Sequence, residues 1–316
     1  YTNLMLRIGI LRGGGGSSHD QSISSGAYPL FLISEKFKDK YKVYDIFVDK
    51  QGVWHFRGVP VDPLELNGKI DIILNAIGDE YLNLMHKIDA FSGIGIPHTG
   101  SGKLSRMISE NVELTKDRFK TLGIKHIDGF RINYEGEYGQ EHAKNIAKRI
   151  WEKVPPPWIV KPVRRSSGVG IHVCKTFGDL ADAIEENFAN QNDILIEEMI
   201  NGKNVITTIV DGYRGESPYV FPFFENAEGQ HKIAKLDDDT KSEINRMAKE
   251  IYKEFGVDHL ATLHFVVHPK KGIYAEFVDT HPSFAQDSHI MNAVSEVGGT
   301  HEGFIEHLIE MVRDNK

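Results

Sequence analysis

The chain has 316 residues, of which 40% are hydrophobic and 26% charged, and its formal net charge is −8. This composition fits a globular protein with enough chain for two or three packed units. The negative charge argues against nucleic acid or an anionic membrane surface as a partner. The single cysteine, Cys174, excludes an internal disulfide and is predicted to be a buried structural thiol. Because no apolar run reaches the roughly 20 residues of a membrane span and the first residues lack a leader pattern, we expect a cytoplasmic protein.

The first third of the chain alternates strands with helices. Strands are predicted at residues 6–11, 43–48 and 71–74, and helices at about 24–37 and 81–91. This alternation predicts a parallel sheet covered by helices, whose ligands bind at the carboxyl ends of the strands. A glycine cluster at 13–16 lies at that edge. It lacks the spacing of a dinucleotide fingerprint, which disfavours a hydride-transferring enzyme.

A turn-rich segment at 97–102 marks the end of this region. Beyond it we predict a helix at 103–122, and then a small mixed unit with strands at 158–161, 171–173 and 194–198 around a helix at 177–188. The last part is predicted to hold strands at 205–210 and 219–224, a helix that ends at Gly256, a hairpin of strands 260–267 and 273–278, and a final helix at 301–312.

Five segments carry a resemblance to a known family. They are LRGGGGSSHDQSISSG at 11–26, GIPHTG at 95–100, WIVKPVRRSSGVG at 158–170, IEEMING at 196–202 and IYAEFVDTHPSF at 273–284. In this order they resemble the D-alanine–D-alanine ligases, and the match covers nearly the whole chain. The resemblance implies an α/β ATP-grasp fold. Its domains would be an N-terminal parallel-sheet domain (1–103), a small central domain (104–200) and a C-terminal α+β domain (201–316).

The nucleotide side of such a site is predicted in the middle of the chain. Lys161 ends a strand and would place an ammonium beside a polyphosphate, while small residues at 166–170 would let backbone N–H groups approach phosphate oxygens. The segment at 196–202 would present main-chain groups to the edge of adenine. A flexible surface turn and a plain edge strand are the alternatives for these two segments. The resemblance implies nucleotide contacts at Lys161, Ser166, Gly168, Glu198, Ile200 and Asn204, the last at the position of a ribose-binding acid.

The resemblance also implies a reaction and a substrate. Family members join D-alanine to D-alanine for cell-wall precursor synthesis, by ATP-dependent carboxylate–amine ligation through an acyl phosphate. Catalytic residues are implied at Ser22, Ser167 and Ser288, of which the family counterparts of Ser167 and Ser288 contact substrate. Asp20 would stand in for a glutamate that falls at Ser18. We therefore expect D-alanine or a similar amino acid as the small-molecule partner, and a homodimer formed through the first domain.

The metal-binding hairpin departs from the family pattern. Magnesium takes oxygen ligands in near-octahedral geometry, but the aspartate and glutamate positions hold His264 and Phe277, which leaves Asp279 as the predicted metal ligand. Glu276 is not expected to replace Phe277, because adjacent strand residues face opposite sides unless a bulge intervenes. His264 with Asp279 is interpreted as a hydrogen-bonded core pair, with a zinc or iron site as the alternative. Two other histidines, His281 and His289, are interpreted as loop residues.

Further family positions are altered. The transition-state arginine falls at Thr262, a nucleotide-binding lysine falls at Val112 with Lys116 one helical turn away, and the substrate-covering loop is shortened to about 225–236. Removing one transition-state donor typically costs about 10²–10³ in rate. We therefore expect weak binding of ATP and Mg²⁺, and weakened ligation. The alternatives are a catalytically silent homologue that binds a small molecule or a protein partner, and an ATP-grasp ligase with a different substrate.

Overall fold

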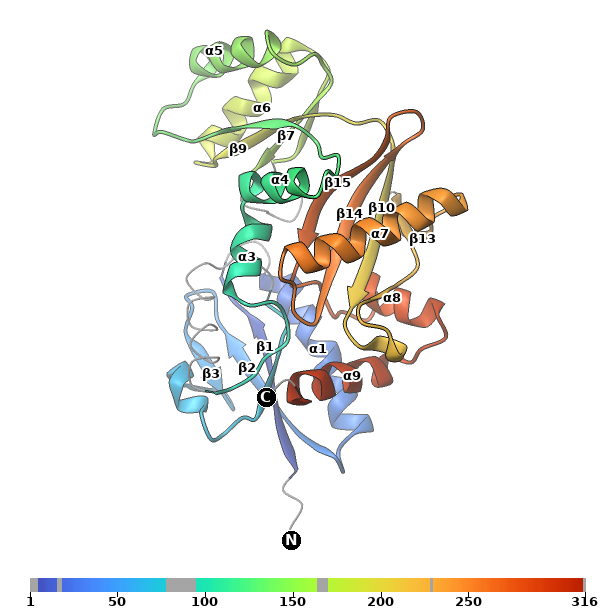
Figure 1. The fold of residues 1–316 in the computed structure, drawn as a ribbon. Helices are drawn as coiled ribbons and strands as arrows, with labels where there is room; N and C mark the ends of the chain where they lie inside the picture. Colours follow the sequence, from blue (N-terminus) through green and yellow to red (C-terminus); the bar gives the residue numbers. More distant parts are fainter. Residues whose placement is uncertain (1–4, 16–18, 78–94, 164–169, 228–229, 315–316) are drawn as a thin grey trace. The chain divides into compact units, whose positions relative to one another are not determined.

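The computed structural model describes residues 5–15, 19–77, 95–163, 170–227 and 230–314, which divide into two compact units. Unit 1 consists of Tyr1–Gly123, Asn204–Phe265 and Phe277–Lys316, and unit 2 consists of Ile124–Lys203 and Val266–Glu276. Figure 1 shows the helices and strands of both, with labels where there is room. The division into three domains stays a prediction. Among the described helices, none is both long and apolar enough to cross a membrane.

A parallel sheet forms one layer of unit 1, as the alternation of strands and helices predicts. β1 (Leu6–Gly13) pairs in parallel with β2 (Tyr41–Val48) on one side and with β5 (Ile72–Asn75) on the other. An antiparallel ribbon of β3 (Trp54–Phe56) and β4 (Val59–Pro60) extends the sheet beyond β2. The carboxyl ends of β1 and β5 therefore lie at the same edge of the sheet.

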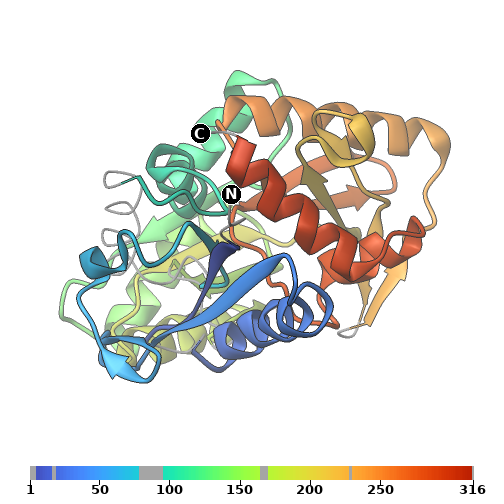
Figure 2. The ribbon, with the colours of Figure 1, turned by 90° about the horizontal axis from the view of Figure 1, so that it is seen from below.

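The two faces of this sheet belong to different apolar clusters. Ile8 and Ile10 pack with residues of α1 (His19–Lys36), which runs along the strands in Figure 2. Leu11 and Ile73 instead join Trp54 and its neighbours on the other face. The alternation follows from the two-residue period of a strand. Because the cluster around α1 also contains residues of the second sheet, unit 1 has a shared core.

The second sheet of unit 1 is built around a long antiparallel hairpin. The turn end of that hairpin, Val266–Glu276, is grouped with unit 2. In spatial order the strands are β13 (Gln230–Ile233), β12 (Phe224–Ala227), β10 (Lys203–Val210), β14 (Leu260–His268) and β15 (Gly272–Asp279), with β11 (Tyr219–Val220) paired to β10.

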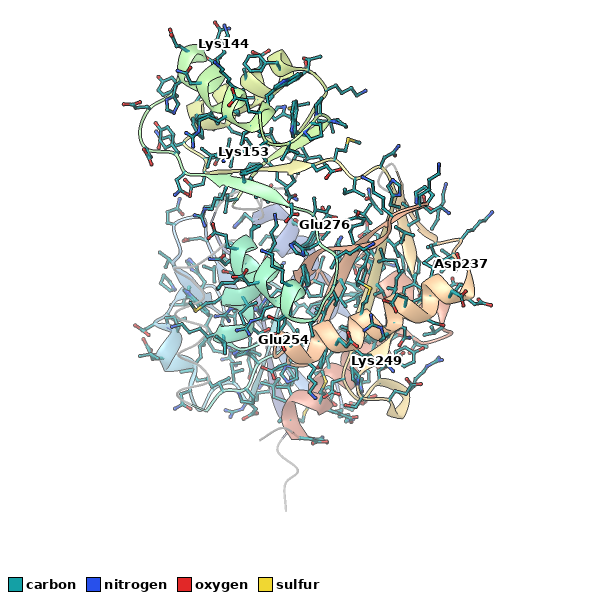
Figure 3. The ribbon with its side chains drawn as sticks, turned by 45° about the horizontal axis from the view of Figure 1, so that its top comes forward. Lys144, Lys153, Asp237, Lys249, Glu254 and Glu276 are labelled. Carbon is teal, nitrogen blue, oxygen red and sulfur yellow. The ribbon has the colours of Figure 1, made fainter. Side chains whose placement is uncertain are left out.

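α7 (Asp238–Glu254) confirms the predicted amphipathic helix. Its buried residues Ile244, Met247, Ala248 and Ile251 fall at helical spacing. The N-cap Asp237 accepts a 2.7 Å hydrogen bond from the Thr240 N–H, and Figure 3 shows Asp237 at the start of the helix. The remaining described helices of unit 1 are α3 (Lys103–Glu110), α4 (Val112–Thr121), α8 (His289–Glu296) and α9 (His301–Asp314), with short 3-10 turns at Pro63–Leu66 and Tyr213–Gly215.

Unit 2 is a four-stranded antiparallel sheet with helices on one face. The apolar cluster of this unit joins residues of α5 (Gln140–Trp151) and α6 (Phe177–Ala189) to alternate residues of the strands. Its single thiol, Cys174, is buried in that cluster, and burial raises the pKa of Cys174 to about 11. The predicted structural thiol is thus confirmed. The strand order is β6 (Gly129–Ile132), β9 (Ile194–Glu198), β7 (Trp158–Pro162) and β8 (His172–Cys174).

Several predicted elements were wrong in their boundaries. The helix predicted at 103–122 is two helices, because Asn111 has extended backbone and its side chain accepts hydrogen bonds from the N–H groups of Glu113 and Leu114. The strand predicted at 219–224 is interrupted at Pro222, which has no N–H for a ladder. The segment predicted as a loop at 225–236 contains the β12–β13 pairing.

Other differences concern the start of α1, the place of His289 and elements that the sequence did not predict. α1 begins at His19, five residues before the predicted start, and includes Gly26, where a Cβ would approach the Cβ of Arg12 to 2.7 Å. Close packing of helix on strand thus accounts for a glycine inside this helix. His289 is the first residue of α8 and not a loop residue. The sequence did not predict α5, α8, β3, β4 or β6. The helix predicted at 81–91 lies outside the described residues.

Candidate functional site

Strand register assigns the residues around Lys161 to one face of the unit 2 sheet. Trp158 and Val160 point to the face covered by α5 and α6. Ile159 and Lys161 alternate with them and therefore point the other way. Ile159 lies opposite Glu197 on β9 and opposite Val173 on β8, and directly opposed residues of antiparallel strands share a face. This second face, called the lysine face below, includes the branched apolar side chains of Ile159 and Val173, the ammonium of Lys161 and the carboxylate of Glu197.

Lys161 contacts two carboxylates. Its Nζ lies 2.7 Å from Glu197 Oε2 and 3.7 Å from Glu276 Oε1, both within unit 2. The side chain of Glu197 is 7% exposed, and those of Lys161 and Glu276 are 23% and 26% exposed. The first contact is a charge-assisted hydrogen bond and the second is a longer ion pair. These three groups together carry a net charge of −1.

A glycine on the neighbouring strand makes room for Glu197. Gly129 on β6 lies opposite Glu197 in the antiparallel ladder. A Cβ at Gly129 would lie 2.6 Å from Glu197 Cγ and 2.7 Å from the Ile196 carbonyl oxygen. Contacts that short do not occur between real atoms, so any larger residue would displace the side chain that contacts Lys161. Gly129 and Glu197 are site residues that sequence reasoning missed. The available signal was a glutamate that follows an apolar run, Ile194–Ile196, inside a predicted strand.

The segment after β9 leaves main-chain groups at the end of the same sheet. The Glu198 N–H donates to the Asp128 carbonyl at 3.4 Å, and the Met199 N–H donates to the Pro157 carbonyl at 2.9 Å. Ile200 is the next residue and lies past the last residue of the strand. The Glu198 side chain is turned to Lys271, with 3.5 Å between Oε1 and Nζ. The Ile200 N–H therefore belongs to the segment that follows the strand, called the hinge below.

The predicted metal positions on the hairpin are occupied by a pair of rings. The imidazole of His264 stacks on the phenyl ring of Phe277, with centroids 3.8 Å apart and planes 20° from parallel. Asp279 Oδ1 accepts a 3.0 Å hydrogen bond from the His281 N–H. In the described part of the chain, no group of three or more His, Cys, Asp or Glu side chains is arranged to hold a metal ion. A magnesium ion requires an oxygen cage, and these residues do not fit one.

Thr262, at the position where the resemblance implies an arginine, lies on β14. It is 4% exposed, and its hydroxyl lies 3.4 Å from the hydroxyl of Thr208 on β10. Two short hydroxyl side chains facing each other inside a sheet supply no positive charge. His281, interpreted from the sequence as a loop residue, does lie after β15 but is buried, with Nδ1 3.1 Å from the Thr280 hydroxyl.

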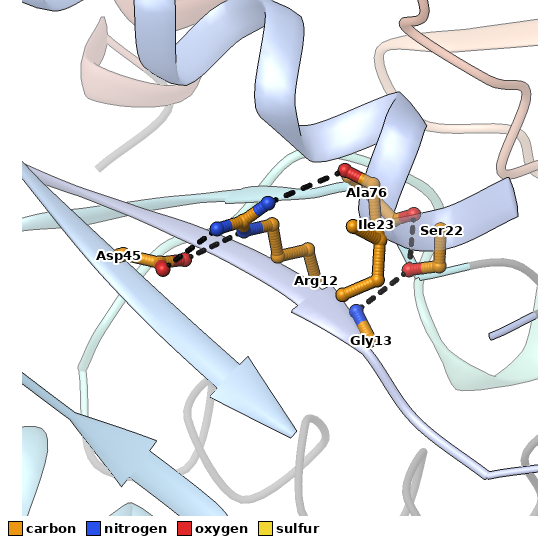
Figure 4. Close-up of polar contacts among 6 residues, drawn as sticks. All are labelled: Arg12, Gly13, Ser22, Ile23, Asp45 and Ala76. Carbon is orange, nitrogen blue, oxygen red and sulfur yellow. Dashed lines mark hydrogen bonds and ion pairs between the residues drawn. The ribbon is translucent and has the colours of Figure 1, made fainter. Parts of the chain in front are cut away.

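Ser22 lies at the carboxyl edge of the parallel sheet of unit 1. Its hydroxyl accepts a 2.9 Å hydrogen bond from the Gly13 N–H and donates a 3.0 Å hydrogen bond to the Ala76 carbonyl, as Figure 4 shows. Gly13 has φ +95°, and a Cβ there would lie 2.1 Å from the Val48 carbonyl oxygen. The serine thus joins the end of β1 to the end of β5. Arg12 precedes Gly13 in the chain, and its guanidinium donates two 2.8 Å hydrogen bonds to the carboxylate of Asp45.

The other predicted site residues are distributed between the units. Ser288 caps α8 by accepting a hydrogen bond from the Met291 N–H, and Asn204 is exposed at the start of β10. Ser166, Ser167 and Gly168 lie outside the described residues. Of the predicted nucleotide contacts, Lys161, Glu198 and Ile200 belong to unit 2, whereas Asn204 belongs to unit 1 with Ser22, Ser288 and Asp279.

Comparison with known proteins supplies the family. The model of the D-Ala D-Ala ligase C-terminus matches residues 119–310, which is more than half of the chain. The chain belongs to the D-alanine–D-alanine ligase family. The D-alanine–D-alanine ligase of Fervidobacterium nodosum is 25% identical over 328 residues, covering 96% of this chain and 98% of the relative. D-alanine–D-alanine ligase B of Clostridium tetani is 24% identical, covering 98% of this chain and 94% of the relative.

Solved structures of this family share the fold. The VanG D-Ala:D-Ser ligase of Enterococcus faecalis superposes with a TM-score of 0.80 at 20% identity, covering 98% of this chain and all of the other. A D-alanine–D-alanine ligase of Bacillus anthracis, complexed with ATP, gives a TM-score of 0.77 at 21% identity, with 98% and 97% covered. The ATP-grasp fold expected from the sequence is therefore confirmed.

Proposed function

We propose that this chain is a cytoplasmic ATP-dependent carboxylate–amine ligase of the D-alanine–D-alanine type, with weak binding of ATP and low turnover. The observation that carries the proposal is the lysine face, where Lys161 lies beside the apolar side chains of Ile159 and Val173. An ammonium suits a nucleotide phosphate, and branched apolar side chains suit the flat face of a base. The relative from Bacillus anthracis, described in complex with ATP, supports ATP as the nucleotide.

Each group of the lysine face has a task in this proposal. Lys161 holds a phosphate oxygen, and the hinge offers the Ile200 N–H to a ring nitrogen of the base. The acyl phosphate forms when a carboxylate oxygen of one amino acid attacks the terminal phosphorus of ATP, and ADP leaves with the electrons of the broken P–O bond. The neutral amine of a second amino acid then attacks the carbonyl carbon of the acyl phosphate. Phosphate leaves with the electrons of the broken C–O bond, and the new amide nitrogen gives one proton to solvent. Because His264 and Phe277 do not fit a magnesium cage, we assign no step to a metal on the hairpin.

The proposal is tested by incubating the purified protein with ATP, Mg²⁺ and D-alanine, and by measuring both phosphate release and dipeptide. We expect slow phosphate release that depends on the amino acid, with dipeptide formed in step. A panel of other small amino acids under the same conditions identifies a changed substrate. Phosphate release that is the same with and without any amino acid would contradict ligation.

A second candidate function is a catalytically silent homologue that binds a small molecule or a protein partner. The stacked ring pair at the metal positions favours it, because stacked rings offer a transferring phosphoryl group no charge compensation. The two functions differ in one measurement. A silent homologue binds ATP or another ligand in an equilibrium titration and releases no phosphate with any amino acid of the panel.

A further inference from the structure

We infer that Glu276 sets the nucleotide affinity of the lysine face, because its carboxylate competes with nucleotide phosphate for the ammonium of Lys161. The inference rests on the proposed function, since it concerns the same site. Among the described residues, Lys161 Nζ lies at hydrogen-bond distance from Glu197 Oε2, at 2.7 Å, and 3.7 Å from Glu276 Oε1. The carboxylate of Glu197 already balances the charge of the Lys161 ammonium, so the carboxylate of Glu276 adds a surplus negative charge.

Glu276 is an unusual residue for its place in the chain. Figure 3 labels it on β15, where it lies between Ala275 and Phe277 in the sequence IYAEFVD. Strands favour branched and aromatic residues and contain relatively few glutamates. A carboxylate that is 26% exposed in such a strand is stabilised by its contact with Lys161. The neighbouring residue Phe277 stacks on His264, so the two adjacent side chains have different partners, as alternation along a strand requires.

Glu197 and Glu276 differ in how easily they can release the lysine. Glu197 is 7% exposed and packed against Gly129, so moving Lys161 away would cost a buried carboxylate this ion pair. Glu276 is partly solvated and makes the longer contact, so water can replace Lys161 around it at lower cost. A phosphate arriving at Lys161 thus displaces Glu276 and not Glu197. The carboxylate of Glu276 then remains beside the phosphate and repels it.

This arrangement predicts a gain of affinity when the charge at position 276 is removed. We expect Glu276→Gln to bind ATP roughly three- to tenfold more tightly than the unmodified protein, because the pair is partly exposed and its strength is reduced by solvent. Adenosine, which has no phosphate, is expected to bind to Glu276→Gln and to the unmodified protein with equal affinity. Glu276→Leu removes the charge without leaving an amide and is expected to show the same preference for ATP over adenosine.

The experiment is a set of calorimetric titrations with ATP and with adenosine at one salt concentration. The matched control is Glu186→Gln, which removes one carboxylate from the same unit at a side chain that is 58% exposed and paired with His172. We expect less than a twofold change with either ligand for the control. Thermal unfolding of each variant establishes that it is folded.

The outcomes separate the inference from the function on which it rests. If ATP binds every protein but Glu276→Gln binds it no more tightly than Glu186→Gln does, the competition is refuted and the proposed function stands. If Glu276→Gln weakens ATP and adenosine alike, the carboxylate contacts the base and the inference is wrong. If neither the unmodified protein nor any variant binds ATP, the proposed function fails and the inference fails with it.

Discussion

The lysine face and the β14–β15 hairpin agree to different extents with the site residues that the resemblance implies. On the lysine face, Lys161 persists on a strand whose register also brings Ile159, Val173 and Glu197 to the same side. On the hairpin, two of three predicted metal positions hold His264 and Phe277, whose rings stack on each other. The sheets that carry both regions are nevertheless intact.

The difference has a physical cause. A nucleotide can be held by strand geometry, main-chain N–H groups and one ammonium, and most of these survive changes of side chain. A magnesium cage needs several side-chain oxygens at once, and the backbone of a paired strand does not provide them. A phenylalanine and a histidine still satisfy a strand, because both pack well on a pleated surface. The hairpin can therefore lose its metal ligands and keep its fold.

The largest effect is expected from Lys161→Met. The change removes the ammonium from Glu197, whose side chain is 7% exposed, and should lower the free energy of unfolding by about 3 kcal/mol. It should also abolish ATP binding. Urea denaturation measures the loss. The control Lys271→Met breaks the exposed Glu198 pair and should cost about 0.5 kcal/mol or less. Adding Glu197→Gln to Lys161→Met should restore part of the stability. No recovery in the double variant would show that the two side chains are not coupled.

A smaller loss is expected from Gly129→Ala. The added methyl would lie 2.6 Å from Glu197 Cγ, so β6 and β9 must separate or the glutamate must move, at a cost of about 1–3 kcal/mol. The matched control is Gly178→Ala in the first turn of α6, where the nearest atom is 3.7 Å away and alanine is the better helix former. We expect the control to leave stability unchanged or slightly raised. Equal stabilities for the two variants would mean that the approach of β6 to Glu197 is not tight.

Substitutions on the hairpin can restore the oxygen ligands that the resemblance implies. Changing His264→Asp, Phe277→Glu and Asp279→Asn together would supply the oxygens that the family uses, and we expect Mg²⁺ to tighten ATP binding about tenfold in this variant but not in the unmodified protein. Titrations with and without Mg²⁺ isolate the effect. Turnover should improve less than binding until Thr262→Arg adds a donor for the transferring phosphoryl group. Robust dipeptide synthesis by the unmodified protein would show that the hairpin needs no repair.

The smallest effect on stability is expected from lowering the pH, which acts on His98 and His259. Burial lowers the pKa of His98 and of His259, and His281 and Arg106 lower that of His98 further. Both imidazoles therefore bind protons less readily in the folded protein than in the unfolded chain. Their contribution is complete above the unfolded pKa of about 6.5 and is lost as the pH falls through the lower folded values.

We expect the urea midpoint to fall by a few tenths of a molar, as an order of magnitude, between pH 7 and pH 5. The fall should be smaller in His98→Gln. The control His142→Gln changes a side chain that is 40% exposed and should keep the fall of the unmodified protein. A fall of the same size in all three proteins would assign the acid sensitivity to other groups.

Prediction from the sequence succeeded where apolar periodicity was unbroken. The strand at 194–198 and the hairpin strands at 260–267 and 273–278 agree with the structure within a residue. It failed where one residue ended an element. Asn111 divides a helix by capping the second half, and Pro222 divides a strand by lacking an N–H. A pattern averaged over many residues does not detect such a local hydrogen bond or its absence.

The sequence by itself predicted that Lys161 lies near the carboxyl end of a strand, and that a histidine and a phenylalanine stand at two positions where the resemblance implies metal ligands. Both are statements about residue types inside short motifs. Only the tertiary structure decided that Lys161 meets Glu197 and Glu276, and that the rings of His264 and Phe277 stack. These partners lie on different strands, so their meeting depends on register and packing, which many distant residues set together.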